Sequence, residues 1–467
     1  MAFGSAQPYD TGFRQQLRDI SAKRLAVLYV LLFFPCLIHA TATHSGQRLV
    51  IVTSFPEQMT GVFKTAFEQR NPGSMVEIIS KKTSAGLKYL DENRNSVDLF
   101  WVSAPDAFEV LKKKGMLKRY RPQAEGIPRR LSGYPVNDPD GYYSGFAAAG
   151  YGVMWNRDYL QTRHLAAPRE WIDLTRPEYQ GHIGLSAPSR SGTTHLTVEA
   201  ILQLRGWQRG WALIKAMAAN AKTITVKSGD VPAGVASGEF GIGIVIDFYG
   251  LMTKAEGAPV EFTYPAETVL VPANIAILEE APRPELAERF IEFLLSPQGQ
   301  QLLLKPEISR LPIRPATYLE NDLPDYFPRP YSARELGAHV AFDVLKSRRR
   351  YNVVNSLFDV MISYRLDELR AAMASVQRAE TLIQSTHQPH PDLAGAVARA
   401  RDLINRIPID ELTAGDPHFA ARFTQKRKKA TDVVTGRQAE IENSWDTFIL
   451  DNYRKAKAIV DSALPPE

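Results

Sequence analysis

The sequence predicts an α/β protein of two lobes joined by a hinge, with an all-α helical extension at its C-terminal end. Over residues 48–318, short apolar runs alternate with amphipathic stretches, which is typical of mixed or parallel sheets covered by helices. Residues 142–155 are β-prone and rich in glycine and alanine, which suits a hinge connection between two lobes. After residue 321, a proline-containing linker gives way to long helical periodicity, and this change predicts the extension.

These observations divide the chain into four expected parts. The first lobe is expected to be discontinuous, because the apolar run over residues 268–278 suits a return crossing from the second lobe. The expected parts are a signal peptide (1–42), a first lobe (48–140 and 275–320), a second lobe (141–274) and a C-terminal helical extension (321–467).

The composition is that of a globular protein. Its 467 residues, 44% hydrophobic and 23% charged, are enough for two or three domains. The net charge of +5 is mild, and no basic stripe is interleaved with aromatic residues, so we expect no nucleic-acid partner. Cys36 is the only cysteine and lies in the expected signal peptide. The mature chain would then form no disulfide, thiol nucleophile or thiolate metal site.

The N-terminal segment has the features of an export signal. Basic residues over 1–24 precede an uncharged apolar run over 25–38, which is too short to span a bilayer. Ala40-Thr41-Ala42 supplies the small residues that a signal peptidase requires. We expect cleavage near Ala42 and a soluble exported protein; the alternative is a retained membrane anchor.

Three strand–loop–helix units open the mature chain. Strands are predicted over 48–53, 75–79 and 97–102, and each precedes an amphipathic helix. Such units form a parallel sheet whose ligands lie beyond the carboxyl ends of the strands. The hydroxyl-bearing residues at these ends are candidate ligand contacts, although each alone could instead cap a helix: Thr53, Ser54, Ser84 and Ser103.

The second lobe is expected to continue this alternation of strands and helices. After the helix that ends near residue 204, we expect helices over 207–219, 231–237 and 248–255, with strands over 223–226, 242–246, 260–264 and 268–278. A helix over 284–295 and a further helix would complete the first lobe.

Residues 184–204 are the strongest candidate for an anion site. A strand leads into a loop of small residues, and an amphipathic helix follows until Gly206. The first N–H groups of a helix lack intrahelical partners and carry partial positive charge, so they suit an anion. The alternative is a capped helix without ligand, with Ser191 as its N-cap. The candidate contacts are Ser189, Arg190, Ser191, Thr193 and Thr194.

Asp247 lies at the carboxyl end of the apolar strand over 242–246. A carboxylate in this position usually orients a hydrogen-bond donor or a cation. The alternative is that Asp247 caps the helix over 248–255.

The extension is predicted to consist of helices over 332–385, 392–407 and 417–462. They would either pack against the first lobe or dock on a partner protein. His387 and His390 are a weak metal candidate, since no carboxylate accompanies them. The basic run over 426–429 is expected to be a solvated helix face.

Several motifs resemble the extracellular solute-binding proteins related to the ferric-ion-binding type. They fall within residues 48–318: S-A-G-L-K-Y-L, V-D-L-F-W-V-S, W-I-D-L-T-R-P-E-Y-Q-G, I-D-F-Y and F-I-E-F-L-L-S-P-Q-G-Q-Q. The resemblance implies the two-lobed periplasmic-binding-protein fold, which closes on a small ligand.

The stretch A-P-S-R-S-G-T-T-H-L-T-V-E-A-I-L-Q and the later N-S-L-F-D-V-M-I-S-Y-R-L-D-E-L resemble a subgroup, the phosphoglycerate transport regulatory proteins of enteric bacteria. This resemblance implies a small phosphorylated anion as ligand, and a membrane sensor kinase or ABC permease as partner. The alternative is the substrate-binding subunit of an ABC importer for ferric ion, phosphonate or sugar phosphate.

The resemblance also implies roles for residues of the second lobe. In sugar-phosphate and phosphonate relatives, an aspartate at the position of Asp247 contacts the ligand, so Asp247, Tyr249 and Glu267 would fix ligand hydroxyls. Ferric-ion relatives have two adjacent tyrosines where this chain has Phe248 and Tyr249. Since a trivalent cation requires several anionic oxygens, iron is the less favoured ligand.

An enzyme is not expected. Ser189, Ser191 and His195 share a loop and helix start, but no orienting acid and no G-x-S-x-G motif accompany them. The sequence also has no spacing typical of a catalytic metal or a phosphate-binding loop, so we expect neither a cofactor nor a metal.

Overall fold

The computed structural model describes residues 47–131, 134–331, 342–386, 390–425 and 432–465. The expected signal peptide with Cys36, residue His387 and the basic run over 426–429 lie outside these ranges. Residues 48–467 form one compact unit. Within the described ranges, no helix combines the length and the apolar character needed to cross a membrane.

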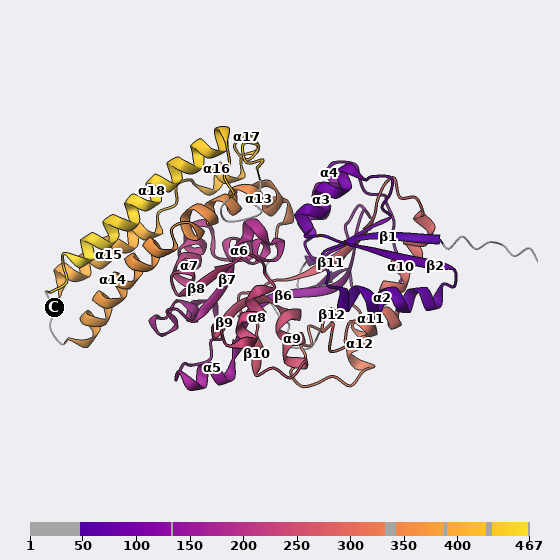
Figure 1. The fold of residues 1–467 in the computed structure, drawn as a ribbon, viewed down its shortest axis with the longest axis horizontal. Coiled ribbons are helices and arrows are strands. Elements are labelled where there is room, and N and C mark those ends of the chain that lie inside the picture. Colours follow the sequence, from indigo (N-terminus) through magenta and orange to yellow (C-terminus); the bar gives the residue numbers. More distant parts are fainter. Residues whose placement is uncertain (1–46, 132–133, 332–341, 387–389, 426–431, 466–467) are drawn as a thin grey trace, which may run out of the picture. The chain divides into compact units, whose positions relative to one another are not determined.

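The first lobe contains the three expected strand–loop–helix units (Figure 1). Strand β1 runs parallel to β3, and β2 lies at the outer edge of the sheet. The units are β1 (Gln47–Thr53) with α2 (Glu57–Arg70), β2 (Ser74–Ser80) with α3 (Thr83–Glu92), and β3 (Leu99–Val102) with α4 (Pro105–Lys113). Later elements of the lobe are α10 (Pro284–Leu295), α11 (Pro297–Leu302), β12 (Leu311–Pro312) and α12 (Ala316–Leu319).

Two long strands, β6 (Ser144–Asn156) and β11 (Leu270–Ile277), connect the lobes. The first half of β6 pairs with β11 and β12, and its second half pairs with β9 (Ile242–Ile246) and β10 (Val260–Thr263). The two expected sheets are therefore joined through β6 into one sheet of ten strands in the described residues. Small residues in β6 permit this, since a Cβ at Gly152 would lie 2.1 Å from the carbonyl oxygen of Thr263.

The second lobe is built on β7 (Ile183–Ser186), which runs parallel to both β8 (Ala221–Thr225) and β9. Trp171, Leu174, Trp207 and Trp211 belong to its buried core. Its remaining elements are α5 (Arg157–Thr162), the turns η1 (Trp171–Thr175), η2 (Pro177–Tyr179) and η3 (Pro188–Arg190), α6 (Gly192–Arg205), α7 (Trp207–Ala219), α8 (Asp230–Ser237) and α9 (Asp247–Ala255).

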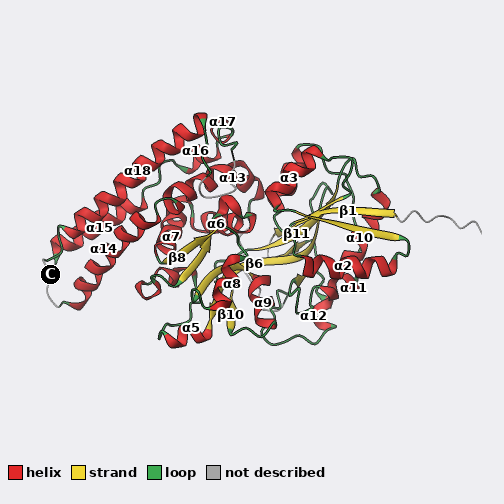
Figure 2. Cartoon of the chain, viewed as in Figure 1, coloured by secondary structure: helices red, strands yellow, loops and turns green. Residues whose placement is uncertain are grey.

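In its described residues, the C-terminal extension consists of helices joined by turns and loops, without a strand (Figure 2). The predicted single helix over 417–462 is wrong, because the short α17 and the long α18 are separate elements with an intervening segment. The elements are α13 (Val344–Phe358), the π-helical turn η4 (Asp359–Ser363), α14 (Leu366–Ser385), α15 (Pro391–Asn405), α16 (Glu411–Gly415), α17 (Pro417–Ala420) and α18 (Gly436–Asp461).

The extension packs mainly on the second lobe. One of our two alternatives assumed that it packs against the first lobe. Helices α14 and α15 lie against α7, while α13 lies against both α6 and α4. Apolar side chains of the extension and the second lobe form one continuous buried cluster. The buried Lys215 on α7 donates to the carbonyls of Ile404 and Arg406, at 2.9 and 2.7 Å. The extension is thus an integral part of the fold.

Candidate ligand-binding site

A cleft of about 980 Å³, counting its open mouth, lies where loops of the two lobes meet. First-lobe residues and second-lobe residues both line it, and one residue comes from the C-terminal extension. The side chains that line it and bear polar groups are Ser54, Lys82, Thr83, Ser84, Ser103, Ser189, Arg190, Ser191, Thr193, Lys227, Ser228, Tyr249, Arg310 and Tyr351.

The first lobe contributes hydroxyls from the loops and helix starts that follow its first three strands. Ser54 follows β1, Ser84 lies in the first turn of α3, and Ser103 follows β3. Thr83 Oγ1 donates to Ser54 Oγ at 3.4 Å, which ties the first two loops together. Strands β1 and β3 are parallel, so their carboxyl ends share one edge of the sheet, and Ser54 and Ser103 follow these ends. Ser84 lines the same cleft beside Thr83.

The second lobe contributes the start of α6. Ser191 is the N-cap of this helix, as predicted, and its hydroxyl accepts a hydrogen bond from Thr194 N at 3.2 Å. Ser191, Gly192 and Thr193 nevertheless also line the cleft, so the cap and the anion-site interpretations are compatible. Ser189 Oγ is buried and has no hydrogen-bond partner within the described residues.

Arg190 brings a buried cation to this helix start. Its side chain is 2% exposed, and its Nη1 lies 3.7 Å from Oδ1 of Asp359 in the extension. In the described part of the chain, neither Nε nor Nη1 has a hydrogen-bond partner. Asp359 therefore balances the charge of the guanidinium, while Nε and Nη1 remain able to donate to an acceptor oxygen of a ligand.

Arg310 is a second buried cation, and the sequence analysis missed it. Its guanidinium carbon lies 4.4 Å from the ring centre of Phe55 and 3.7 Å from that of Phe248. Burial lowers the pKa of Arg310 to about 10, and the nearby Asp247 opposes this shift. Nη1 and Nη2 are both buried without a partner among the described residues. A charged donor pair in this state requires an acceptor.

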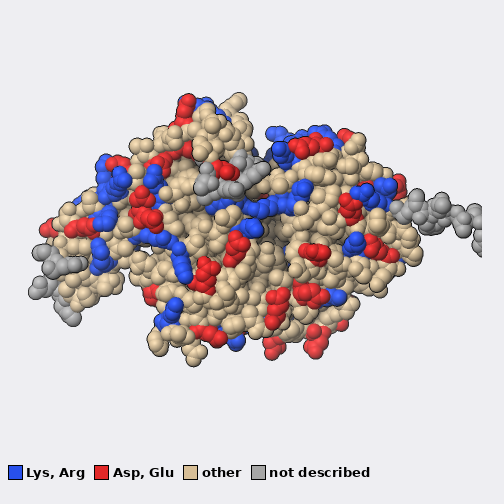
Figure 3. Space-filling view, viewed as in Figure 1, with Lys and Arg blue, Asp and Glu red and all other residues tan. Residues whose placement is uncertain are grey.

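Lys82 and Lys227 complete a set of four cations around the cleft. No Asp, Glu or His is among the described residues that line it. Figure 3 shows Lys and Arg side chains gathered in a band near the centre of the visible face. Lys227 and Ser228 follow the parallel strand β8, so the rule that selected Ser54, Ser84 and Ser103 would also have found them.

Two tyrosines form part of the walls. Tyr249, a predicted contact, packs against Phe248 with ring centres 4.3 Å apart. Tyr351 comes from α13 of the extension, and its ring lies 3.9 Å from that of His195. No local sequence signal indicates Tyr351, because only the packing of α13 against α6 brings it to the cleft.

Four predicted contacts are not among the residues that line the cleft: Thr53, Thr194, Asp247 and Glu267. The Thr53 hydroxyl is buried and donates to the carbonyl of Trp101 at 2.6 Å. Glu267 instead forms an ion pair with Arg205, Nε to Oε2 at 2.5 Å.

Asp247 lies beneath the cleft, where its carboxylate organises the backbone. It accepts hydrogen bonds from the N–H groups of Gly150 and Phe248, each at 2.7 Å, and from the Tyr264 hydroxyl at 3.0 Å. Burial raises the pKa of Asp247 to about 6. The capping alternative is wrong, because α9 begins at Asp247 itself, its N-cap is Ile246, and no described side chain caps it. The negative charge of Asp247 instead acts on Arg310.

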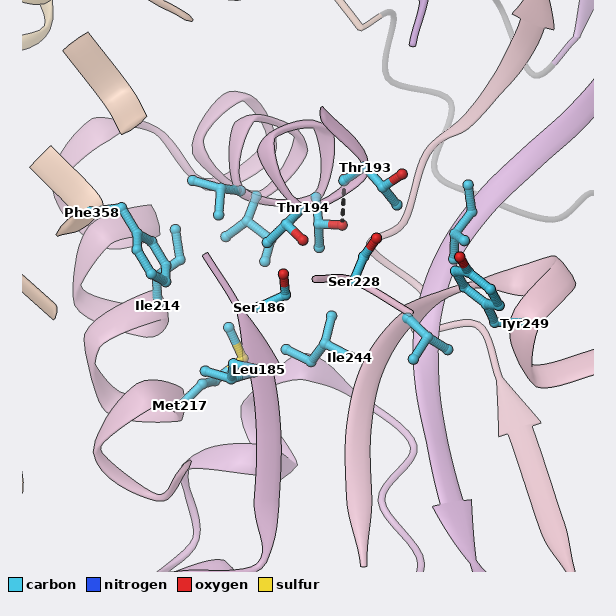
Figure 4. A pocket seen from close by; sticks show the side chains of 15 residues that line it. Leu185, Ser186, Thr193, Thr194, Ile214, Met217, Ser228, Ile244, Tyr249 and Phe358 are labelled. Carbon is cyan, nitrogen blue, oxygen red and sulfur yellow. Dashed lines mark hydrogen bonds between the residues drawn. The ribbon is translucent and has the colours of Figure 1, made fainter. Parts of the chain in front are cut away.

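Thr194 lines a neighbouring apolar pocket instead (Figure 4). This pocket lies between β7, β9, α6 and α7 and shares Thr193, Ser228 and Tyr249 with the cleft. Its other walls are mainly aliphatic, so it belongs to the core behind the helix start. Those walls include Leu185, Val198, Ile201, Ile214, Met217, Ile244 and Phe358.

The arrangement is suited to a small anion that also bears hydroxyl groups. Cations and helix N–H groups attract phosphate or carboxylate oxygens, and serine and tyrosine hydroxyls can exchange hydrogen bonds with a polyol. The described residues contain no cluster of three or more histidines, cysteines and carboxylates that would hold a metal ion.

Comparison with known proteins adds relatives of the whole chain. The family model described as bacterial extracellular solute-binding protein matches residues 95–331. The phosphoglycerate transport regulatory protein PgtC of Salmonella typhimurium is 30% identical over 417 residues, which cover 88% of this chain and 96% of that protein. The protein of the same name from Salmonella typhi matches to the same extent.

Solved structures share the fold. The periplasmic binding protein AfuA of Actinobacillus pleuropneumoniae, with exogenous fructose-6-phosphate bound, aligns with a TM-score of 0.59 and 22% identity over 68% of this chain and 98% of its own. Iron-bound HitA of Pseudomonas aeruginosa aligns with a TM-score of 0.56 and 17% identity over 66% and 98%. The predicted fold class is thereby confirmed.

Proposed function

Because this chain belongs to the family of bacterial extracellular solute-binding proteins, we propose that it captures a small phosphorylated organic anion between its two lobes. A phosphoglycerate-like compound is the proposed ligand. The name of the Salmonella relative and the fructose-6-phosphate bound to AfuA both support a phosphate ester.

One observation carries this proposal: Arg310 and Arg190 each hold buried guanidinium nitrogens without hydrogen-bond partners in the described part of the chain, and both residues line the cleft. Buried charged donors are costly unless an acceptor pairs with them. A phosphate group offers several strong acceptor oxygens and about two negative charges, and arginine matches this geometry with paired donors. The helix start at Gly192 adds backbone N–H groups to the same wall.

The hydroxyl-bearing residues would select among phosphorylated compounds. Ser54, Ser84 and Ser103 from the first lobe face the cleft together with Ser189, Ser191, Thr193 and Tyr249 from the second. We assign the remainder of the ligand, with its hydroxyl or carboxylate groups, to these side chains and to Lys82 and Lys227.

The lining argues against ferric ion as the ligand. The only phenol that the resemblance assigns to iron is Tyr249, and the described lining residues include no carboxylate or imidazole. Hard trivalent ions require several anionic oxygen ligands. Likeness in fold to iron-bound HitA does not supply them. Phosphonates and sugar phosphates share the anionic group and remain within the proposed class.

We further propose that the protein acts in the periplasm, after cleavage near Ala42, and that its ligand-bound state is read by a membrane partner. A sensor kinase that controls phosphoglycerate transport is the proposed partner, and an ABC permease is the alternative. The name of the Salmonella relative, a transport regulatory protein, supports the first of these.

Calorimetric titration of residues 43–467 tests the ligand. We expect binding of at least one compound among 3-phosphoglycerate, 2-phosphoglycerate, phosphoenolpyruvate and fructose-6-phosphate. Glycerate and fructose are the matched controls that lack phosphate, and they should bind far more weakly because they lack the dianionic group and the acceptor oxygens proposed to pair with the two arginines. Affinity should also fall as salt is raised, since four cations surround the site.

Ferric citrate completes the panel. If no phosphorylated compound binds, the proposed function is overturned, and binding of ferric ion in that case would favour the iron-importer alternative.

A further inference from the structure

The C-terminal extension reaches the cleft at two points. Tyr351 of α13 lines the cleft, and Asp359, one residue beyond the end of α13, contacts the cleft residue Arg190. The guanidinium group of Arg190 therefore lines the cleft and also contacts the extension.

The Arg190–Asp359 pair is fully enclosed, since the two side chains are 2% and 0% exposed. The separation of 3.7 Å between Nη1 and Oδ1 is longer than a hydrogen bond, although the charges still attract strongly in a buried setting. An anion in the cleft would offer Arg190 a closer acceptor. The carboxylate of Asp359 and the ligand thus compete for the same cation.

Asp359 also begins the π-helical turn Asp359–Ser363, which separates α13 from α14. Ser363 Oγ donates to Asp359 Oδ1 at 2.9 Å, so the carboxylate holds the turn closed on itself. Single π-helical turns within longer helices are uncommon and frequently lie at functional sites. A change in what Asp359 contacts would therefore act on the turn directly.

The same turn is fixed to α18. The hydroxyl of Tyr453, a buried residue of α18, donates to the carbonyl of Met361 at 2.8 Å. Just beyond the turn, Arg365 forms a two-bond ion pair with Asp446 of α18, with distances of 2.7 and 2.5 Å. Continuous contacts thus run from Arg190 through Asp359 and the turn to the longest helix of the extension.

We propose that the C-terminal extension reads the state of the cleft through Arg190: an anion that engages this guanidinium weakens its attraction to Asp359 and shifts the turn Asp359–Ser363 together with α18. This coupling rests on the proposed function, because it requires an anionic ligand at Arg190. It gives the extension a regulatory role at that site. By linkage, a change that removes the pull of Asp359 on Arg190 also changes ligand affinity.

The variant Asp359→Asn tests the coupling, with Asp367→Asn as the matched control. Asp367 undergoes the same chemical change on the neighbouring α14, but its side chain is 92% exposed. With 3-phosphoglycerate as the probe, we expect Asp359→Asn to tighten binding on the order of fivefold, because the competing carboxylate is gone. The control should bind as the unchanged protein does.

Amide hydrogen exchange provides a second readout that needs no variant. In the unchanged protein, the probe should alter protection of amides over residues 359–363 and in α18. In Asp359→Asn, these changes should be lost while binding is kept. If Asp359→Asn fails to fold, the exchange measurement on the unchanged protein alone still tests the coupling.

The possible outcomes separate the two proposals. Binding of the probe without any change in exchange over residues 359–363 and α18 would overturn the coupling and leave the proposed function intact. Equal affinities of Asp359→Asn and Asp367→Asn would also overturn it. No binding by any phosphorylated compound would overturn both.

Discussion

At the scale of single residues, Arg310 accounts for much of the chemistry of the cleft. Phe55 and Phe248 hold its guanidinium in place from two sides, so little order remains to be imposed when an anion binds. Asp247 supplies negative charge nearby but engages Gly150, Phe248 and Tyr264 with its hydrogen bonds. The donors of Arg310 are thereby left for a ligand.

Replacing Arg310 should therefore weaken anion binding strongly. We expect Arg310→Gln to raise the Kd for 3-phosphoglycerate by tenfold to a hundredfold, since a charge-assisted hydrogen bond contributes about 1.5–3 kcal/mol. Calorimetric titration measures this change. Arg209→Gln, an exposed position on α7, is the control and should leave Kd unchanged. Equal Kd values for the two variants would contradict a role of Arg310 in binding.

His195 gives the folded protein a defined dependence on pH. It is fully buried between Asn355 Oδ1 at 2.8 Å and Ser347 Oγ at 3.1 Å, and burial lowers its pKa to about 3. Between pH 6.5 and 3 the unfolded chain thus binds a proton that the folded chain does not. As the pH is lowered through this window, the free energy of unfolding should decrease, by up to about 1.4 kcal/mol per pH unit from this group.

Urea denaturation of the unchanged protein and of His195→Gln at pH 7.5 and pH 5 checks this expectation. The stability difference between the two should shrink at the lower pH. Asp247, whose raised pKa acts in the opposite direction, is present in both proteins and cancels in the comparison. The exposed His418→Gln is the control, and its difference from the unchanged protein should stay constant.

The sequence predicted individual cleft residues where a local rule applies. Ser54, Ser84 and Ser103 lie at strand ends, and Ser191 caps a helix, so short-range geometry places them. Thr53 does not line the cleft. The side chains of a strand alternate between its two faces, and the Thr53 hydroxyl is directed to the carbonyl of Trp101. Arg310 and Tyr351 reach the cleft only through long-range packing, which no spacing in the sequence reveals. Whether these residues bind ligand stays a prediction.

At the scale of elements, helix α13 is fixed to the second lobe by a buried ion pair. Arg350 Nη2 lies 2.6 Å from Glu199 Oε1 on α6, and neither side chain is exposed. Desolvation raises the pKa of Glu199, and Arg350 acts against this shift. A second acid, Glu411 on α16, lies 2.6 Å from Arg350 Nη1. One arginine thus connects α13, α6 and α16.

Removing only the cation should destabilise the protein. We expect Arg350→Met to lower the free energy of unfolding by about 3–5 kcal/mol, because Glu199 is left buried without a counter-charge. Urea denaturation measures this loss. The double variant Arg350→Met/Glu199→Gln should regain part of it, and the exposed neighbour Arg349→Met should change little. A loss as small as that of Arg349→Met would contradict the assigned role.

Element boundaries were predicted well where apolar periodicity is strong. Helices α7 and α10 and strand β9 have the predicted limits. The prediction was wrong in the region of α17 and α18, where a single helix over 417–462 was expected. The residues of β6 are compatible with either one sheet or two, and only their partners β9 to β12 settle the arrangement.

At the scale of the whole molecule, the extension and the second lobe share one apolar core. The packing of α14 and α15 on α7 buries apolar side chains of the second lobe. Removing the extension would expose that surface to water, at a cost of about 25 cal/mol per Å² of apolar area. The second lobe thus depends on the extension for its stability.

A chain that ends at residue 341 should therefore fail to fold cooperatively. We expect increased binding of a hydrophobic dye and aggregation, measured by fluorescence and by light scattering during gel filtration, relative to residues 43–467. A soluble, monomeric product with a sharp thermal transition would show instead that the two lobes are independent of the extension.

The position of α13 across both lobes also has a consequence in time. Its Arg348 donates to the Glu109 carbonyl of α4 at 3.3 Å, while the same helix is held to α6 through Arg350. A ligand enclosed by the lobes can leave quickly only if they separate, and separation must first break the contacts of α13 with one of them. We expect long residence of the bound anion. Rapid-mixing chase experiments should show faster ligand release from Arg348→Ala than from the exposed neighbour Arg349→Ala. Helix α13 would then determine how long the protein stays loaded after the surrounding ligand is gone.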